Sequence, residues 1–293
     1  MKSQVDPMIL LKKGDSFACG LGDGTIQIYC LEKPYSLQIE MKIHDSAINS
    51  IFESKFGELI TGSDDSTIKV SKYNLKDHIF KVIKTLKGHE SNVYNVIQLE
   101  KRFTSVLYAS CSKDQTIKIW NKKACQIIQS YKNIEGVWCL LELSNYRIIF
   151  CQSKLYNGLF EINYKKASIT KKNDIVKCIG TNGLCKIKIK DKNYIAIASK
   201  GEIHIVDDIH FTIQNTFKID TFTYFWNVTF LSDKTLLLSG SDEYIYHILI
   251  DKGKLISKTK IHLDEIPTII EIKNNIMITC SYDKTIKFWK LKE

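Results

Sequence analysis

The peptide SKDQTIKIW at residues 112–120 returns as SYDKTIKFW at residues 281–289. A weaker copy, SDDSTIKVS, spans residues 63–71. Aligning the chain on the first apolar residue of the shared TIKIW segment gives seven copies, which recur at intervals of 41 to 49 residues. The seven anchor residues are Ile26, Ile68, Ile117, Phe160, Ile203, Ile245 and Ile286. A fragment that recurs at such a period indicates a repeat architecture.

Each copy carries the same order of strand and turn signals. In the third copy, apolar runs at 95–99 and 106–112 precede a polar turn at 113–115. The TIKIW segment and a last run, QIIQSY at 126–131, follow this turn. Alternating apolar residues between short polar turns are typical of strands joined by hairpins. Four strands per copy predict an all-β fold, a seven-bladed β-propeller that occupies residues 1–293 as a single domain.

Histidine and aspartate residues recur at related positions in the strongest copies. The pairs, with their separations, are His44 and Asp65 (21 residues), His89 and Asp114 (25 residues), and His262 and Asp283 (21 residues). Gly88 precedes His89, and Trp120 follows Asp114 by six residues. This pattern resembles the WD-repeat family, in which a Gly-His start, an Asp in a hairpin turn and a terminal Trp mark each repeat. The resemblance spans the whole chain and is strongest in the second, third and seventh copies.

The resemblance implies a hydrogen-bonded set in each strong copy, built from the His, the Asp, a strand Ser or Thr, and the Trp. The implied residues are His89, Asp114, Trp120 and either Ser110 or Ser112; His262, Asp283, Trp289 and either Thr279 or Ser281; and the pair His44 and Asp65. Such a set is chemically reasonable because buried imidazole, carboxylate, hydroxyl and indole groups each need a partner. Where another residue replaces the Trp, as Tyr29, Ser71 and Ile248 do, we expect the blade to rely on apolar packing.

The His-Asp pairs do not predict an active site. A catalytic pair needs a nucleophile beside the base in an open cleft, whereas these pairs recur from copy to copy without a third catalytic element. The sequence contains no CxxC motif and no phosphate-cradling glycine loop. We therefore expect a chain without enzyme activity, catalytic residues, metal or cofactor, and a small-molecule ligand is disfavoured.

Aromatic residues gather where the chain leads into the innermost predicted strands. Equivalent positions in three copies hold Tyr94, Trp138 and Trp226, and Tyr224, Phe225 and Tyr282 are expected nearby. Exposed aromatics are typical anchors of protein interfaces, and the resemblance implies that this face docks peptides. The alternative is that the rings only pack between neighbouring blades. The sequence thus predicts a non-enzymatic interaction scaffold that binds a protein or peptide partner at the loops leading into the inner strands.

The last blade is expected to lack its outer strand. Residues 7–23 align with residues 267–283 without a gap, and nothing in the first copy matches the strand expected at 254–261. The chain stops after the third strand of the last copy, unless residues 1–5 supply the fourth. An open apolar edge is a template for pairing, so an architectural subunit completed by a partner's strand is a second hypothesis. The alternative is a three-stranded blade protected by its own lysines.

The positive charge of the chain raises a nucleic-acid hypothesis. The formal net charge is +10, but only two of the 42 basic residues are arginines. Specific phosphate and base recognition favours the planar arginine fork. A solvated lysine surface is therefore the preferred interpretation, and a nucleic-acid-associated propeller is the alternative. The alternating lysines in LCKIKIKDK at 184–192 suggest either an anion-binding stripe or a strand displaced toward solvent.

Composition also bounds the compartment. Nine scattered cysteines, an odd number, fit buried thiols in a reducing environment better than a disulfide framework. The first residues, MKSQVDPM, lack the apolar core of a signal peptide, and no apolar run approaches the length of a membrane helix. We therefore expect a cytoplasmic or nuclear protein that does not insert into membranes.

Overall fold

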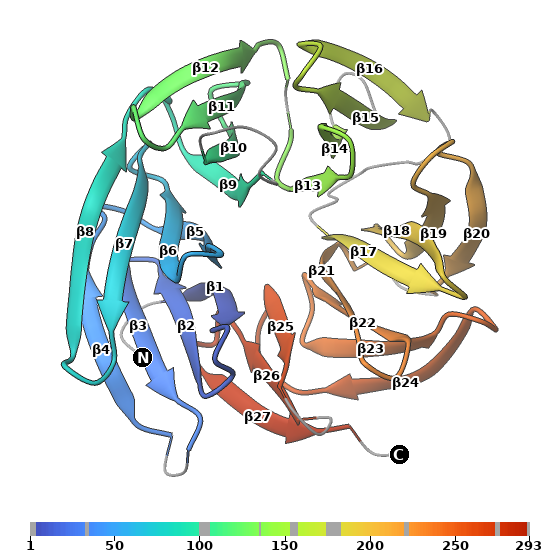
Figure 1. The fold of residues 1–293 in the computed structure, drawn as a ribbon. Helices are drawn as coiled ribbons and strands as arrows, with labels where there is room; N and C mark the ends of the chain where they lie inside the picture. The colour runs from blue at the N-terminus through green and yellow to red at the C-terminus, as the bar shows by residue number, and fades with distance from the viewer. Residues whose placement is uncertain are drawn as a thin grey trace. The chain divides into compact units, whose positions relative to one another are not determined.

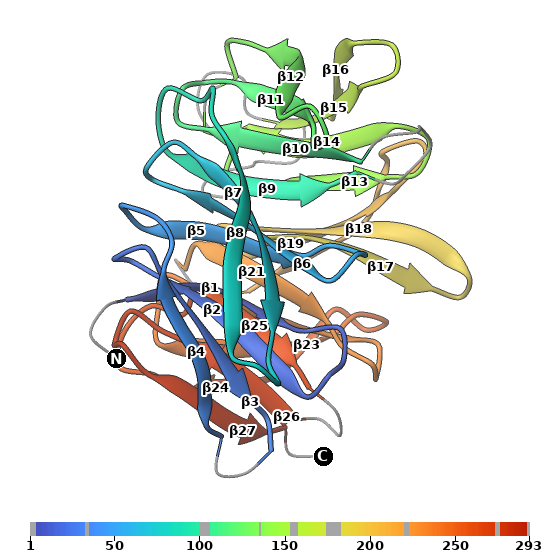
Figure 2. The same cartoon turned by 60° about the vertical axis from the view of Figure 1, so that its left-hand side comes forward.

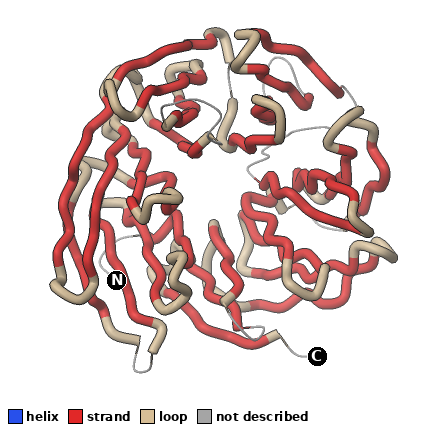
Figure 3. Tube along the Cα trace, in the orientation of Figure 1, coloured by secondary structure: helices blue, strands red, loops and turns tan. Residues whose placement is uncertain are grey.

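The computed structural model describes residues 4–32, 35–99, 106–134, 136–152, 158–173, 183–219, 223–272 and 276–291. The long regular elements in these ranges are β-strands, as Figure 3 shows. Within them, no helix has the length and hydropathy that crossing a membrane requires. Residues Met1–Ile134 form one compact unit, and residues Glu135–Glu293 form a second. The organisation as a single domain stays a prediction.

The first unit contains three antiparallel sheets of four strands, and in each sheet the strands are ordered as in the chain (Figure 1). The first sheet consists of β1 (Val5–Leu10), β2 (Ser16–Leu21), β3 (Thr25–Cys30) and β4 (Leu37–Lys42). The second consists of β5 (Ile48–Glu53), β6 (Glu58–Ser63), β7 (Ile68–Asn74) and β8 (Ile79–Leu86). The third consists of β9 (Val93–Gln98), β10 (Leu107–Ser112), β11 (Ile117–Asn121) and β12 (Gln126–Tyr131).

The second unit contains three further four-stranded sheets and a last sheet of three strands. The fourth sheet consists of β13 (Leu140–Leu143), β14 (Arg147–Gln152), β15 (Gly158–Asn163) and β16 (Ser168–Asn173). The fifth consists of β17 (Gly183–Ile189), β18 (Lys192–Ser199), β19 (Glu202–Asp207) and β20 (Ile213–Lys218). The sixth consists of β21 (Phe225–Phe230), β22 (Thr235–Gly240), β23 (Tyr244–Leu249) and β24 (Lys254–Lys260). The last consists of β25 (Thr268–Glu271), β26 (Ile276–Cys280) and β27 (Ile286–Lys290).

Seven successive antiparallel sheets, each built from one repeat, are the blades of a seven-bladed β-propeller. The predicted fold class is thereby confirmed. The predicted run 126–131 coincides with β12, and the boundaries of β9, β10 and β11 lie within two residues of the predicted runs. The last blade has three strands among the described residues, as expected. Residues 1–3 lie outside the described ranges, and Val5 belongs to β1.

The turn between the second and third strands explains why the TIKIW segment is so well preserved. In the third blade, Asp114 Oδ1 accepts hydrogen bonds from Thr116 N (3.0 Å) and Thr116 Oγ1 (2.6 Å). Gln115 between them adopts a φ of 65°, and Ser66 and Lys284 repeat this conformation with φ of 64°. Because few side-chain-bearing residues tolerate left-handed backbone, the Asp side chain is needed to hold the turn.

Within the first unit, consecutive sheets pack face to face. The inner strand β5 lies against β1 and β9 lies against β5 in the views of both Figure 1 and Figure 2. Two glycines permit this approach: a Cβ added at Gly20 would lie 2.6 Å from Ile48 Cγ2, and one added at Gly62 would lie 2.9 Å from Val93 Cγ1. Glycine is required at both positions because the next inner strand comes too close for a side chain.

Second strands form the centre of the blades. The strands β2, β6, β10 and β22 are buried along their whole length. Cys19, Cys111 and Cys280 lie on second strands of the first, third and seventh blades and are completely buried. Small thiols behave as compact apolar side chains in such positions.

The lysines at 184–192 do not form a buried row. Lys186 and Lys188 in β17 are exposed, and Ile187 between them is buried. Lys190 lies in the following hairpin turn with a φ of 45°. Lys188 Nζ lies 3.3 Å from Asp191 Oδ1, and both side chains are exposed. The alternation therefore produces an ordinary half-solvated strand in this part of the chain.

Candidate functional site

A buried hydrogen-bond network holds the third blade together. His89 lies just before β9, and its Nδ1 is 2.7 Å from Asp114 Oδ2. A carboxylate only accepts, so Nδ1 carries the proton and donates to Asp114. The His89 Nε2 atom then accepts a hydrogen bond from the Ser110 hydroxyl (2.7 Å), and Trp120 Nε1 donates to Ser110 Oγ (2.7 Å). All four polar groups are satisfied, and Ser110 rather than Ser112 is the strand hydroxyl of the set.

The seventh blade has the same network without its last link. His262 Nδ1 lies 2.9 Å from Asp283 Oδ2, and His262 Nε2 lies 2.9 Å from Thr279 Oγ1. Trp289 Nε1 is buried and has no hydrogen-bond acceptor among the described residues. The implied set therefore comprises His262, Asp283 and Thr279, and the indole of Trp289 contributes packing only.

The second blade shows that the pair forms even where the Trp is replaced. His44 Nδ1 lies 2.7 Å from Asp65 Oδ2, and His44 Nε2 lies 2.8 Å from Thr61 Oγ1. Ser71 occupies the Trp position, and its hydroxyl is buried without a partner among the described residues. The His-Asp pair is thus the constant part of the network, and the aromatic link is variable.

Burial and hydrogen bonding shift the pKa values of these groups. Burial alone would raise the pKa of the Asp114 carboxyl, but bonds from Thr116, the Glu90 N–H and His89 outweigh it and hold this pKa well below its usual range. For Asp283, bonds from Thr285, the Leu263 N–H and His262 outweigh burial in the same way. Burial lowers the pKa of His89 and of His262 despite the attraction of the neighbouring carboxylate. The pairs are therefore a neutral imidazole and a carboxylate at neutral pH.

Polar networks also hold blades that lack the His-Asp pair, which corrects the expectation that those blades rely on apolar packing alone. In the sixth blade, Asp242 Oδ2 accepts hydrogen bonds from the Thr223 hydroxyl (2.6 Å) and the Tyr246 hydroxyl (2.6 Å). In the first blade, the Tyr29 hydroxyl donates to Gln27 Oε1 at 2.9 Å. Asp242 precedes its anchor residue by the same three positions as Asp283 does, so the sequence held a signal for the first of these networks.

The networks hold the blades together and are not arranged for catalysis. Both ring nitrogens of His89 are occupied, and Ser110 is completely buried between His89 and Trp120. A nucleophile in this position has no access to a substrate. Among the residues that the structure describes, no group of three His, Cys, Asp or Glu side chains is placed to hold a metal ion.

Two of the predicted binding residues meet in the second unit: Trp226 lies in the inner strand β21, and Tyr282 lies in the turn between β26 and β27, where its N–H donates to the Glu265 carbonyl just before β25. The rings of Trp226 and Tyr282 lie 5.9 Å apart, centroid to centroid, and both side chains are half-buried. Tyr224 is also half-buried, and the Lys200 amino group lies 5.0 Å from the centroid of its ring. Trp138, which precedes β13, is 40% exposed. These aromatics each keep an accessible part that a partner can contact.

Tyr94 occupies the corresponding place in the first unit. It lies in β9 and is half-buried, and both burial and the negative charge of Asp64 raise the pKa of its hydroxyl. Asp64 Oδ1 also accepts a hydrogen bond from Asn49 Nδ2 at 2.7 Å. A phenol beside a carboxylate combines an apolar ring with a polar rim, as interface residues commonly do.

Phe225 has a different role from the one predicted. Its side chain is completely buried and packs edge to face on Tyr246, with ring centroids 5.2 Å apart. Successive strand residues point to opposite faces of a sheet, so Phe225 faces inward between two partly accessible aromatics. The prediction that Phe225 contributes to a binding surface is corrected on this ground.

The edge of the last blade is less covered than its counterpart in the third blade. The residues of β11 from Ile117 to Trp120 are buried, and β11 pairs with β12 along its outer edge. The almost identical residues of β27, from Ile286 to Trp289, are only half-buried, and no fourth strand pairs with β27 among the described residues. One side of β27 therefore presents backbone groups that no described strand covers.

The fold and the networks define a class of protein: a repeat propeller in which the second, third and seventh blades carry His-Asp hydrogen bonds. Residues 35–70, 80–121 and 270–290 match the family model described as WD domain, G-beta repeat. These three segments are thus WD40 repeats, and the resemblance drawn from the His, Asp and Trp positions is confirmed.

Curated relatives match parts of the chain. It is 26% identical over 163 residues to the probable coatomer subunit beta' of Schizosaccharomyces pombe, and this match covers 54% of the chain and 18% of that relative. It is 38% identical over 95 residues to the nuclear distribution protein nudF 1 of Talaromyces marneffei, and this match covers 32% of the chain and 18% of that relative. It is 28% identical over 108 residues to the nuclear distribution protein PAC1 of Saccharomyces cerevisiae, and this match covers 37% of the chain and 22% of that relative. The chain spans less than a quarter of the length of these relatives, and none of them is named as an enzyme.

Proposed function

We propose that the chain is a non-enzymatic scaffold that binds a protein or peptide partner at the loops leading into its inner strands. The observation that carries this proposal is the contact between Trp226 of the inner strand β21 and Tyr282 of the β26–β27 turn, two half-buried rings 5.9 Å apart. Rigid aromatic pairs supply a large contact area at a low cost in side-chain entropy. Burial of both ring nitrogens in the His-Asp pairs removes the main alternative, catalysis at those pairs.

The names of these relatives are compatible with an intracellular role. They describe a coatomer subunit and nuclear distribution proteins. We extend from these names only the general expectation of a cytoplasmic or nuclear protein that works by binding other proteins.

The test is quantitative capture of proteins from the native cells by the immobilised chain. We expect Trp226→Ala to reduce retention of the principal partner about tenfold, because truncating an aromatic anchor commonly removes more than 1.4 kcal/mol of binding energy. Ile256→Ala is the matched control, since Ile256 lies on the outer strand β24 of the same blade and is 49% exposed. Tyr94→Ala and Ile128→Ala form the corresponding pair in the third blade.

Circular dichroism and thermal unfolding of each variant show whether the fold is retained. Loss of capture by Trp226→Ala but not by Ile256→Ala supports the proposal. Equal retention by all variants would show that the partner binds elsewhere, and the assignment of the aromatic surface would be abandoned.

The edge of β27 favours a second candidate function, an architectural subunit whose last blade is completed by a partner's strand. Its support is the contrast between the covered β11 and the half-buried β27, which carry nearly the same sequence. Strand addition uses main-chain hydrogen bonds for affinity and alternate side chains for specificity. Lys287 Nζ already donates to the Ile261 carbonyl at 2.7 Å, so this lysine is not available to repel an added strand.

A further inference from the structure

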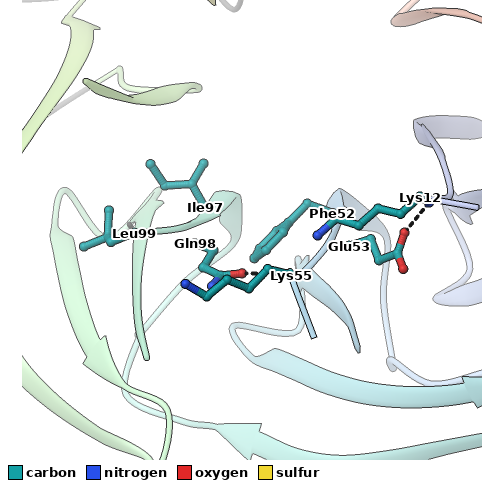
Figure 4. A pocket seen from close by; sticks show the side chains of 7 residues that line it. All are labelled: Lys12, Phe52, Glu53, Lys55, Ile97, Gln98 and Leu99. Carbon is teal, nitrogen blue, oxygen red and sulfur yellow. Dashed lines mark hydrogen bonds between the residues drawn. The ribbon is translucent and has the colours of Figure 1, made fainter. Parts of the chain in front are cut away.

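The first unit contains a pocket at the far ends of its inner strands. β5 ends at Glu53 and β9 ends at Gln98, and the pocket lies where these two ends and Lys12, which follows β1, come together (Figure 4). Its volume is about 380 Å³. Ligand pockets commonly measure about 300–1,000 Å³, so this pocket is large enough for one or two side chains of a bound peptide.

Apolar side chains form the walls of the pocket. Phe52 comes from β5, Ile97 comes from β9, and Leu99 follows β9 directly. The Phe52 ring is held by an edge contact with the buried Tyr108, with ring centroids 6.0 Å apart. Phe52 and Ile97 are both half-buried, so each has surface left to contact an apolar group.

The single carboxylate in the pocket already accepts hydrogen bonds from within the fold. Glu53 Oε2 accepts a hydrogen bond from the Lys12 backbone N–H at 2.6 Å, and Glu53 Oε1 accepts one from the Tyr73 hydroxyl at 3.0 Å. These bonds fix Glu53 against the neighbouring strands. They reduce its capacity to attract a cation from solution.

The basic groups, by contrast, retain donors. Lys12 Nζ donates to the Ser54 carbonyl at 2.8 Å, which uses one of its three N–H groups. Lys55 is exposed, and its amino group lies 5.6 Å from the centroid of the Phe56 ring. Gln98 Oε1 accepts from the Lys55 backbone N–H at 3.2 Å, which leaves the Gln98 amide N–H groups directed away from that bond. Among the described residues, neither lysine amino group has a salt bridge to a carboxylate.

We infer that this pocket binds an acidic peptide segment through a large apolar side chain. The apolar side chain contacts Phe52 and Ile97, and flanking carboxylates of the peptide accept hydrogen bonds from Lys12 and Lys55. The net charge of +10 favours the approach of an acidic partner over a basic one. Charge complementarity thus selects an acidic peptide as the occupant.

This site is separate from the aromatic surface proposed above. Tyr94 lies near the start of β9 and Gln98 is its last residue. Strand residues rise by about 3.3 Å each, so the two positions are about 13 Å apart along the strand. The inference therefore does not depend on the function proposed for Tyr94 and Trp226, and either can fail alone.

The test uses fluorescein-labelled hexapeptides and fluorescence anisotropy with the full chain. DEFDLE carries acidic and apolar side chains, DESDSE lacks the apolar ones, and KKFKLK reverses the charge. We expect saturable binding of DEFDLE and affinities at least about tenfold weaker for the other two, since each lacks one half of the complementarity.

Lys55→Glu and Ile97→Ser test the two halves of the pocket, and Lys81→Glu is the matched control. Lys81 is an exposed lysine on the outer strand β8, so its reversal changes the net charge equally without touching the pocket. We expect Lys55→Glu to weaken DEFDLE binding about tenfold, Ile97→Ser about fivefold, and Lys81→Glu less than twofold. Absence of saturable DEFDLE binding, or equal loss in Lys55→Glu and Lys81→Glu, would overturn the inference.

Discussion

At the residue scale, two tryptophans in equivalent positions differ in one hydrogen bond. Trp120 Nε1 donates to Ser110, whereas the buried Trp289 Nε1 has no acceptor among the described residues. We expect Trp120→Phe to lower the free energy of unfolding by about 2 kcal/mol, because it loses this bond and leaves a gap in a fully buried site. Trp289→Phe removes a buried donor without a partner, and its cost should be below about 0.5 kcal/mol.

Urea unfolding followed by far-ultraviolet circular dichroism measures both changes independently of tryptophan fluorescence. The slope of the transition must stay constant for the comparison to hold. An equal loss in the two variants would show that the hydrogen bond of Trp120 adds nothing to its packing.

The titrating residues predict a loss of stability in acid. Burial lowers the pKa of His89 and of His262 in the folded chain, so the unfolded chain binds more protons once the pH falls below about 6.5. Stability is therefore complete above about pH 6.5 and declines below it. The depressed pKa values of Asp114 and Asp283 add a further loss as the pH falls below about 3.9.

Urea unfolding between pH 8 and pH 5 measures the first part of this decline. His89→Gln should reduce the dependence of stability on pH, because it removes one of the buried imidazoles whose pKa is lowered by burial. A flat profile over this range would contradict the neutral state assigned to both rings.

The choice of hydroxyl in the network shows where sequence reasoning ends at this scale. Ser110 and Ser112 are two residues apart on one strand and therefore point to the same face, so the pattern alone left both open. In the structure, Ser110 contacts His89, and the Ser112 hydroxyl donates to the Ser91 carbonyl and accepts from the Asp114 N–H. Only the three-dimensional path of the loop before β9 decides between them.

At the element scale, the contrast between β11 and β27 concerns backbone protection. Alternate N–H groups of β11 are bonded to β12, whereas β27 pairs only with β26 among the described strands. We expect the outward-facing amides of β27 to exchange with deuterium at least about a hundredfold faster than those of β11, since exchange from unpaired edge groups needs little opening.

Hydrogen-exchange mass spectrometry of the chain alone and with its captured partner measures this difference. Slow exchange along all of β27 would show that another segment covers the edge. Protection that appears only with the partner would support the second candidate function, completion of the last blade.

The strands were predictable because their alternating apolar residues and turn signals repeat seven times along the chain. The network of Thr223, Asp242 and Tyr246 was missed, although Asp242 stands in the expected position. A Thr hydroxyl donates to this Asp where the strong copies use an imidazole, and the Tyr hydroxyl comes from the position that holds Lys118 in the third blade, since Ile248 occupies the Trp position. Only the Asp carries over between the two sets. Such substitutions keep the hydrogen bonds while changing every side chain but one.

At the scale of the whole molecule, the net charge of +10 predicts weak and salt-sensitive binding to nucleic acid. A lysine-rich surface attracts phosphates mainly through counterion release. We expect a labelled DNA duplex to bind at about 0.02 M salt and to lose at least a hundredfold in affinity by about 0.2 M. Fluorescence anisotropy measures the slope.

A dissociation constant below about 1 μM at about 0.2 M salt would contradict this expectation and favour the nucleic-acid alternative. The sequence alone does not decide the matter because it shows how many lysines there are but not how they gather. The same limit applied to the pocket between β5 and β9, whose lining residues are ordinary apolar and charged side chains of three different repeats. Fold class follows from repetition, whereas a site depends on what differs between repeats.

The buried cysteines make the opening of the fold a chemical observable. Cys19, Cys111 and Cys280 are completely buried, and burial raises the pKa of the Cys19 thiol to about 12. Alkylating reagents attack the thiolate, so each of these residues reacts only when its own blade opens to water. The three lie in the first, third and seventh blades, and their separate labelling rates therefore report which part of the chain loosens first.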